Sequence, residues 1–283
     1  MLETIQAKVG DFSPAERRVA RAVMAHYPAA GLETVAKLSE RAGTSAPSVL
    51  RFASRLGFNG FPEFQQALRD ELEARNASPL AAMGAGADTQ RHHTSAVPGR
   101  SLPAQFVTGI ERTLERLPAN ELGSAVSLLA DTHRNVTVGG GRFTGLLAKY
   151  FVQHLMQLRP KVRDLPDAAV PRADAILRLG KRDVLVLMDY RRYESATLDA
   201  AQKAAKSGAK IILLTDRWLS PVASLATVVL PASVDSPSPY DSYVPTMAII
   251  ETLIAGVLEE LGDEAARRMQ SFEALSQELS LIE

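Results

Sequence analysis

The apolar positions of this chain change their spacing once, and the change divides the chain into two parts. Over residues 1–77 the apolar residues recur at every third or fourth position, which predicts helices that bury one face. Beyond about residue 105, short apolar runs alternate with such helical stretches, which predicts a parallel sheet covered by helices on both faces. Between them, residues 78–104 are rich in Ala, Gly, Ser and Pro and are predicted to be a linker.

Residues that start and end helices define the elements of the first part. Ser13 is the expected N-cap of one helix, with Pro14 at its first position and Glu16 three residues after the cap. Ser45 is expected to cap a later helix, which ends at Gly57. The predicted helices of this part cover residues 13–28, 33–43, 45–57 and 61–75.

The second part alternates between the two kinds of element. Its predicted strands cover residues 135–140, 161–165, 183–189, 210–216 and 226–232. Its predicted helices cover residues 106–117, 121–132, 143–158, 195–208, 242–261 and 263–279.

Composition narrows the functional classes. The 32 basic and 32 acidic residues cancel, so any affinity for nucleic acid has to come from a local patch. The chain has no cysteine, which excludes disulfides, thiolate-bound zinc and a thiol nucleophile. The N-terminus lacks the apolar segment of a signal peptide, and no apolar run reaches the length of a membrane span. We therefore expect a cytoplasmic protein that does not enter a membrane.

A local basic surface is predicted in the first part. Residues 33–57 read as a helix, the short turn "AGTS" and a second helix, which is the helix-turn-helix pattern. Arg51 and Arg55 lie four positions apart on one face of the second helix, and no acid occurs between Arg41 and Gly60. The spacing alone does not separate a DNA-binding domain from an ordinary small helical domain.

The residues of the second helix carry a more specific signal. "SAPSVLRFASRLGFNGFPEFQQAL" and "SPAERRVARAV" strongly resemble the N-terminal domain of the RpiR family of bacterial transcriptional regulators. The resemblance implies binding to double-stranded operator DNA. The implied contacts are Lys37, Thr44, Ser45, Ser48, Arg51 and Arg55. The implied structural packing residues are Phe52, Leu56, Phe58, Phe61 and Phe64, with Val49 on the same core-facing stripe.

Residues 105–283 resemble the second domain of that family, a sugar isomerase (SIS) domain, on "DVLVLMDY", "ATLDAAQKAAKSGAKIILLTD" and "SPVASLATVVL". The expected fold is therefore an all-α helix-turn-helix domain over residues 1–77. The linker joins it to a flavodoxin-like α/β three-layer sandwich with a five-stranded parallel sheet. SIS domains similar to this one self-associate through helices beside the sheet, which implies a homodimer or homotetramer.

Ligands of open parallel sheets bind beyond the carboxyl ends of the strands, and one turn there is rich in glycine. In "GGGRFTG", backbone N–H groups at a helix N-terminus favour anions, although a tight turn explains the glycines equally well. Similar SIS domains carry G-x-G-x-S here. The resemblance places Gly140 at the first glycine, Arg142 at the second and Thr144 at the serine, with Gly141 between them.

A second turn, "DYRRYE", is charged where related domains are not. SIS domains that bind phosphosugars carry S-x-S-G-x-[ST], so Asp189 and Arg191 take the two serines. Arg192 takes the glycine, Glu194 takes the final Ser/Thr, and Tyr193 lies between them. A phosphate beside two carboxylates meets repulsion on the order of 1–4 kcal/mol per pair. The side chain of Arg192 would also obstruct approach to the helix amides.

Two interpretations of this turn remain open. In the first, arginine side chains grip a small polar, anionic metabolite such as a sugar phosphate, sugar acid or organic acid. Asp189 and Glu194 would then orient those arginines or accept hydrogen bonds from ligand hydroxyls. In the second, Asp189–Arg191 and Glu194–Arg192 are internal ion pairs, and the pocket is empty or an interface.

The predicted function is a DNA-binding transcriptional regulator controlled by that metabolite, and not an enzyme. One alternative is a sugar-phosphate aldose–ketose isomerase with Glu194 as base, but the flanking arginines would hold this carboxylate ionised and paired. The other is a DNA-binding protein whose SIS domain serves only for oligomerisation.

Other polar residues give weaker signals. The five histidines show no metal-ligand spacing apart from the adjacent pair His92 and His93, so neither a metal nor a cofactor is expected. His133 precedes the first strand, at the edge of the sheet away from the ligand. Ser220 is expected to begin a helix, and Tyr240 and Tyr243 are candidate pocket walls.

Overall fold

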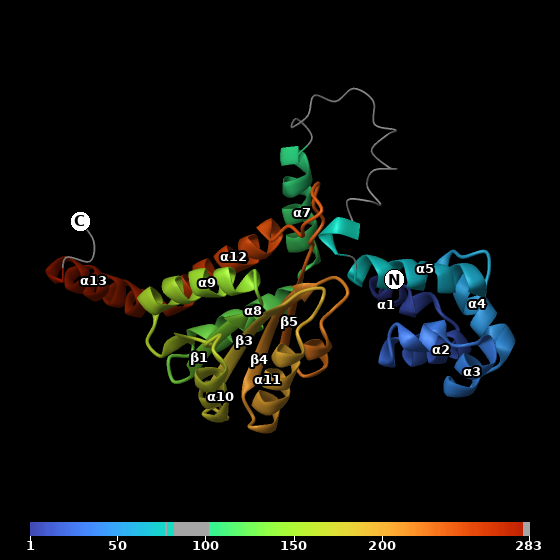
Figure 1. Ribbon diagram of the computed structural model, residues 1–283, viewed down its shortest axis with the longest axis horizontal. Helices are drawn as coiled ribbons and strands as arrows, with labels where there is room; N and C mark the ends of the chain where they lie inside the picture. The colour runs from blue at the N-terminus through green and yellow to red at the C-terminus, as the bar shows by residue number, and fades with distance from the viewer. Residues whose placement is uncertain (77, 82–101, 280–283) are drawn as a thin grey trace. The chain divides into compact units, whose positions relative to one another are not determined.

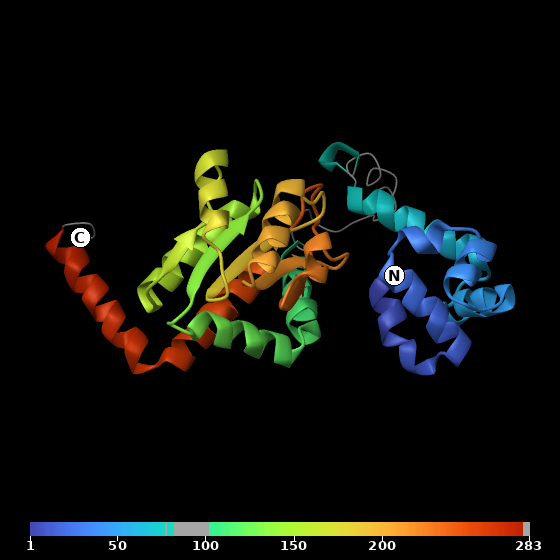
Figure 2. The same cartoon turned by 90° about the horizontal axis from the view of Figure 1, so that it is seen from below.

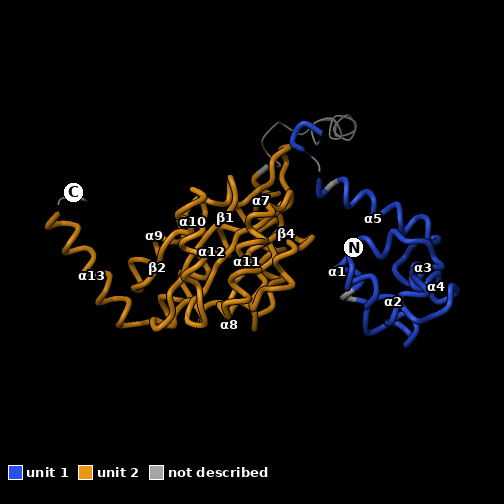
Figure 3. The backbone as a smooth tube through the Cα atoms, turned by 60° about the horizontal axis from the view of Figure 1, so that its bottom comes forward, with its two compact units in different colours: residues 1–90 blue, residues 91–283 orange. Residues whose placement is uncertain are grey.

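The computed structural model describes residues 1–76, 78–81 and 102–279, and its two compact units are Met1–Gln90 and Arg91–Glu283 (Figure 3). The boundary falls inside the predicted linker, of which residues 82–101, with His92 and His93, lie outside the described residues. Residues 102–104 are not linker, because helix α7 (Leu102–Arg116) already begins at Leu102. Pro103 is compatible with this early start, since the first turn of a helix needs no N–H from its residues.

The first unit consists of helices, as predicted. They are α1 (Leu2–Ala7), α2 (Pro14–Ala25), α3 (Val35–Arg41), α4 (Ala46–Leu56) and α5 (Phe61–Asn76). The start of α2 is confirmed in detail: the hydroxyl of Ser13 accepts the N–H of Glu16, and the carboxylate of Glu16 accepts the N–H of Ser13 at 2.8 Å.

An aromatic cluster joins these helices. Phe52 of α4 is fully buried, and its ring centroid lies 5.3 Å from that of Phe12 and 5.8 Å from that of Phe64. Val49 and Leu56 are buried on the same stripe, so the predicted core face of α4 is confirmed. Burying this stripe leaves the opposite face of α4 to solvent.

The second unit contains a five-stranded, all-parallel sheet in the order β2-β1-β3-β4-β5. Its strands are β1 (Asn135–Gly140), β2 (Val162–Asp164), β3 (Asp183–Asp189), β4 (Lys210–Asp216) and β5 (Val228–Ala232). Every residue of β3 is buried, as expected for the central strand of a sheet covered on both faces.

Helices cover both faces of the sheet (Figures 1 and 2). On one face lie α8 (Ala119–Ala130), α9 (Thr144–Leu158) and α12 (Val244–Leu261), and on the other lie α10 (Ala169–Leu177) and α11 (Ser195–Lys206). Helix α7 packs on α12, and α13 (Asp263–Glu278) packs on α9. Among the described helices, none combines the length and the apolar character that a membrane span requires.

Helix α10 was not predicted from the sequence. Its inward side is narrow: Ala175 and Ile176 pack half-buried against the core, whereas Val170 and Leu177 are exposed. The periodic signal that identifies a core-facing helix is therefore weak here.

The connections define where a ligand would bind. From β1 the chain passes through α9 to β2 on one side, whereas β3 leads through α11 to β4 on the other. Neighbouring strands whose connections diverge in this way leave a crevice at their carboxyl ends. The turns at residues 141–144 and 190–194 lie at this point.

Candidate functional site

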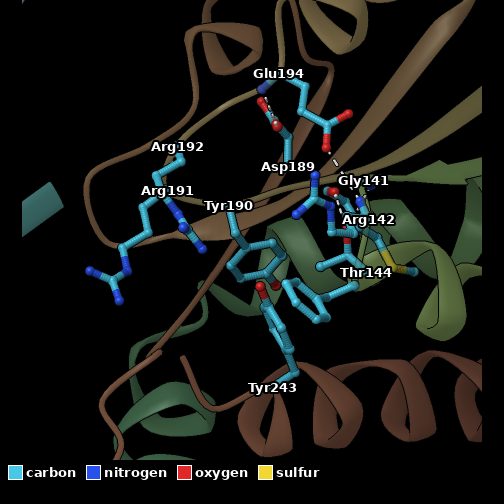
Figure 4. Close-up of a pocket in the computed structure, with 11 residues that line it drawn as sticks. Gly141, Arg142, Thr144, Asp189, Tyr190, Arg191, Arg192, Glu194 and Tyr243 are labelled. Atoms are coloured by element: carbon cyan, nitrogen blue, oxygen red, sulfur yellow. Dashed lines mark hydrogen bonds between the residues drawn. The ribbon is translucent and has the colours of Figure 1, made fainter. Parts of the chain in front are cut away.

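A cavity of about 300 Å³ lies at the carboxyl ends of β1 and β3 (Figure 4). Of the nine residues predicted for the ligand, it is lined by Gly141, Arg142, Thr144, Asp189, Arg191, Arg192 and Glu194. The further lining residues are Phe143, Met188, Tyr190 and Tyr243, of which only Tyr243 was a candidate. Gly140 and Tyr193 are not among the lining residues.

The glycine turn has a structural role at Gly140. A Cβ atom on Gly140 would lie 2.6 Å from the carbonyl carbon of Thr144, so only glycine lets the strand pass this close to α9. The hydroxyl of Thr144 accepts the N–H of Gly141 at 2.8 Å and donates to the carbonyl of Met188 at 2.9 Å. Thr144 therefore ties the turn after β1 to strand β3.

Glu194 crosses the pocket to reach this turn. Its Oε1 accepts the N–H of Arg142 at 3.3 Å, and Figure 4 shows the contact as a dashed line. A Cβ atom on Gly141 would lie only 2.7 Å from the same oxygen. Gly141 thus leaves room for the Glu194 carboxylate.

Asp189 ends β3 with a buried carboxylate. It accepts hydrogen bonds from the hydroxyl of Ser220 and from the N–H of Glu194, the latter at 3.4 Å. Burial raises the pKa of Asp189 to about 6, and the nearby carboxylates of Glu194 and Asp216 add to the rise, whereas the two hydrogen bonds lower it. Ser220 also caps the short helix Pro221–Ser224, as predicted.

Arg191 pairs with Asp241, a residue outside the predicted site. Its Nε lies 2.5 Å from Oδ1 of Asp241, and both side chains are about nine-tenths buried, with exposures of 11% and 9%. Asp189 and Glu194 instead accept hydrogen bonds from the hydroxyl of Ser220 and from backbone N–H groups. The internal ion pairs Asp189–Arg191 and Glu194–Arg192 of the second interpretation are thus not among the ion pairs of the described residues.

Arg192 has a backbone conformation that favours glycine. Its φ of 65° is in the left-handed region, which costs a residue with a side chain about 1–2 kcal/mol. The family resemblance places Arg192 at the glycine of related domains, and this conformation explains why a glycine suits the position. Its side chain is exposed and lines the cavity, on the side opposite Gly141 and Thr144 (Figure 4).

Aromatic residues form the floor of the pocket. The rings of Tyr190 and Tyr243 meet edge to face with centroids 5.3 Å apart, and the hydroxyl groups of Tyr190 and Thr246 lie 2.7 Å apart. Tyr193 points elsewhere, because its hydroxyl donates to Oδ1 of Asp216 at 2.8 Å. Tyr240 is exposed and does not line the pocket.

The helix-turn-helix surface has a small polar network of its own. Arg51 and Arg55 are exposed on α4, but Ser48 is only 3% exposed. The hydroxyl of Ser48 lies 3.0 Å from that of Ser45 and accepts from Nη2 of Arg51 at 3.0 Å. Ser45 is the N-cap residue of α4, as predicted, but its hydroxyl makes no capping hydrogen bond and contacts the hydroxyl of Ser48 instead.

The remaining predicted contacts around this network differ in exposure and pairing. Lys37 is exposed and Thr44 is half-buried. Arg41, one of the arginines counted in the basic surface, forms an ion pair with Glu33 at 2.6 Å. The positive charge of this surface therefore rests on Arg51 and Arg55, with Lys37 beside them.

His133 and His154 take no part in either surface. His154 is half-buried on α9 and packs against Tyr150 with ring centroids 4.5 Å apart. His133 lies in the turn before β1, at the far edge of the sheet, as expected. Within the described residues, no group of three or more His, Asp or Glu side chains could hold a metal ion.

Comparison with known proteins agrees with both units. Residues 1–75 match the family described as "Helix-turn-helix domain, rpiR family", and residues 128–256 match the family described as "SIS domain". The HTH-type transcriptional regulator HexR of Escherichia coli (strain K12) is 24% identical over 253 residues, which cover 89% of this chain and 84% of that protein. HexR of Pseudomonas aeruginosa is 25% identical over 91% of this chain and 88% of that protein.

Two solved structures share the fold. One is the sugar isomerase domain of an RpiR transcription factor from Sphaerobacter thermophilus, with a TM-score of 0.57 and 22% identity over 62% of this chain and 99% of that chain. The other is the Vibrio vulnificus NanR protein, complexed with ManNAc-6P, with a TM-score of 0.56 and 18% identity over 98% of both chains.

A helix-turn-helix unit followed by a parallel SIS sheet defines a two-domain transcriptional regulator. The two matches together span well over half of the chain, and the relatives described above are named transcriptional regulators. The chain belongs to the RpiR family of transcriptional regulators.

Proposed function

We propose that the chain binds an operator through α4 and that a small polar anion in the SIS pocket changes this binding. The observation that carries the proposal is a cavity at the switch point of the sheet, lined by Arg142 and Arg192, in a chain that also has a helix-turn-helix unit. A DNA-bound helix-turn-helix protein works as a symmetric assembly in the cytoplasm, so we propose a homodimer or homotetramer there.

On the DNA side, Arg51 and Arg55 are proposed to contact phosphates or base edges, because both are exposed on one face of α4. Lys37, Thr44 and Ser45 are proposed as further contacts around the same helix. For Ser48 we propose an indirect role, since its buried hydroxyl holds the guanidinium of Arg51.

On the ligand side, Arg142 and Arg192 are proposed to bind the acid group of the effector. The solved NanR structure is a complex with ManNAc-6P, which supports effector binding in a domain of this fold. In the present pocket arginines stand where related domains have glycine at these two positions, so side-chain guanidinium groups are proposed to replace backbone contacts.

The pocket is proposed to have no enzymatic activity. An isomerase needs a base that reaches a substrate carbon, with a pKa near the working pH. Glu194 is held at the N–H of Arg142, and Asp189 is buried beneath Ser220. Both carboxylates are thus engaged by hydrogen bonds within the protein, which supports a role in binding.

Titration of DNA binding with candidate effectors tests the proposal. Fluorescence anisotropy with a duplex selected by the protein would be recorded with sugar acids, organic acids and sugar phosphates. We expect one acid to change the affinity for DNA by about fivefold or more. Arg142→Gln should weaken that response, whereas Arg178→Gln, an exposed arginine at the C-terminal cap of α10, should not. An unchanged DNA affinity with every compound would contradict the proposal.

A further inference from the structure

Two helices begin at the pocket, and each presents backbone N–H groups to it. The turn at residues 141–144 leads into α9, and the turn at residues 190–194 leads into α11. The N-terminus of a helix attracts an anion, because its first N–H groups lack partners and the helix dipole is positive there. In this chain a carboxylate already lies in the turn before each helix. One accepts the N–H of Arg142, next to the N-cap Phe143, and the other accepts the N–H of the N-cap residue Glu194.

Glu194 occupies the first of these positions. Its Oε1 accepts the N–H of Arg142, and Gly141 leaves the space that this oxygen fills, since a Cβ atom there would lie 2.7 Å away. Asp189 occupies the second position, where it accepts the N–H of Glu194 at 3.4 Å and the hydroxyl of Ser220. The two carboxylates are thus linked through Glu194, which accepts one hydrogen bond with its side chain and donates another with its N–H.

We propose that Glu194 and Asp189 are built-in anions that make this pocket reject phosphate esters and select a polyhydroxy carboxylate, that is, a sugar acid. The proposal rests on the proposed function, that the pocket binds a polar metabolite. A phosphate would have to displace the carboxylates from the amides or lie beside them, and both like-charge contacts are unfavourable.

The remaining groups fit the other half of such a ligand. Ionised carboxylates only accept hydrogen bonds, and each has lone pairs beyond the contacts described, so Glu194 and Asp189 favour ligand hydroxyls. Arg142 and Arg192 line the same cavity and can each form a paired hydrogen bond with a single carboxylate group. Tyr190 and Tyr243, whose rings meet edge to face at the floor of the pocket, supply aromatic surface for a carbon chain or ring.

Calorimetry with inorganic phosphate tests the exclusion directly, without any knowledge of the true effector. The proteins are the full-length wild type, Glu194→Ala, which vacates the amide of Arg142, and Glu194→Gln, which removes the charge and keeps the shape. Asp199→Asn is the matched control, because it removes one exposed carboxylate from the same helix α11. A hexose 6-phosphate and a hexonic acid are titrated in parallel.

We expect Glu194→Ala to bind inorganic phosphate and the hexose 6-phosphate at least about tenfold more tightly than the wild type, which corresponds to about 1.4 kcal/mol. The phosphate affinity of Glu194→Gln should lie between those of the wild type and Glu194→Ala, and the phosphate affinity of Asp199→Asn should equal that of the wild type. The hexonic acid should bind the wild type more tightly than it binds Glu194→Ala, because a hydrogen-bond acceptor for its hydroxyls is lost.

Equal phosphate binding by the wild type and Glu194→Ala, or none by either protein, would overturn the proposal. Should Glu194→Ala fail to fold, Glu194→Gln decides the question, because it removes the charge and keeps the shape. In an NMR titration with inorganic phosphate, the amide proton of Arg142 should shift in Glu194→Gln and stay in place in the wild type. Since neither readout involves DNA, a pocket that rejects phosphate without controlling DNA binding would refute only the proposed function.

Discussion

The two candidate sites of this protein are both rich in arginine, yet they handle charge in opposite ways. On α4, Arg51 and Arg55 face solvent, and a buried serine holds one of them. In the SIS pocket, Arg191 is paired with Asp241, and the carboxylates of Glu194 and Asp189 accept hydrogen bonds from backbone N–H groups. The first surface keeps its positive charge for an external anion, whereas the second supplies anions of its own.

The DNA side of this comparison predicts the largest effect. Arg51→Ala combined with Arg55→Ala should lower operator affinity by about a hundredfold or more, since each contact contributes about 1–3 kcal/mol. The slope of log affinity against log salt should also fall, by about two if both residues contact phosphates. Fluorescence anisotropy over a salt series measures both quantities.

Arg69→Ala is the control for this double variant, because Arg69 is exposed on α5 of the same unit and has not been assigned to the DNA-binding surface. Its operator affinity should remain near that of the wild type. If the control lost as much affinity as the double variant, binding would depend on overall charge, and α4 would have no special role.

On the pocket side, the pH dependence of stability in the wild type and in Asp189→Asn tests whether the carboxylate of Asp189 is buried. Burial raises the pKa of Asp189 from 3.8 to about 6, so the folded protein keeps this proton at pH values where the unfolded chain has lost it. Wild-type stability should therefore decrease relative to Asp189→Asn as the pH rises from about 4 to above 6, by roughly 3 kcal/mol in all. Urea unfolding of both proteins across this range measures the difference, and a constant difference would show that the carboxylate is not strained by burial.

Ser48→Ala carries the smallest expected change. The variant should lower operator affinity by about fivefold, near 1 kcal/mol, because Arg51 loses the hydroxyl that holds its guanidinium. Ser54→Ala, on the exposed side of the same helix, serves as the control in the same anisotropy assay. A loss that also appeared in Ser54→Ala would indicate a general effect on α4.

How much of each site follows from the sequence depends on how local its contacts are. The burial of Ser48 was predictable, because it lies four positions before Phe52 on the stripe that faces the core. The contacts of Asp189 with Ser220 and of Arg191 with Asp241 were not, since they join residues 31 and 50 positions apart. Periodicity predicts elements and faces, but it gives no information about which distant side chain satisfies a charge.

The response of DNA binding to a sugar acid in Arg192→Gly tests the central claim most directly. Glycine suits the φ of 65° at this position, so the variant should be about 1 kcal/mol more stable than the wild type, and misfolding would not explain a lost response. We predict that a sugar acid changes the operator affinity of the wild type by about fivefold or more and leaves the operator affinity of Arg192→Gly unchanged. An equal response in both proteins, or a response to sugar phosphates alone, would contradict the account.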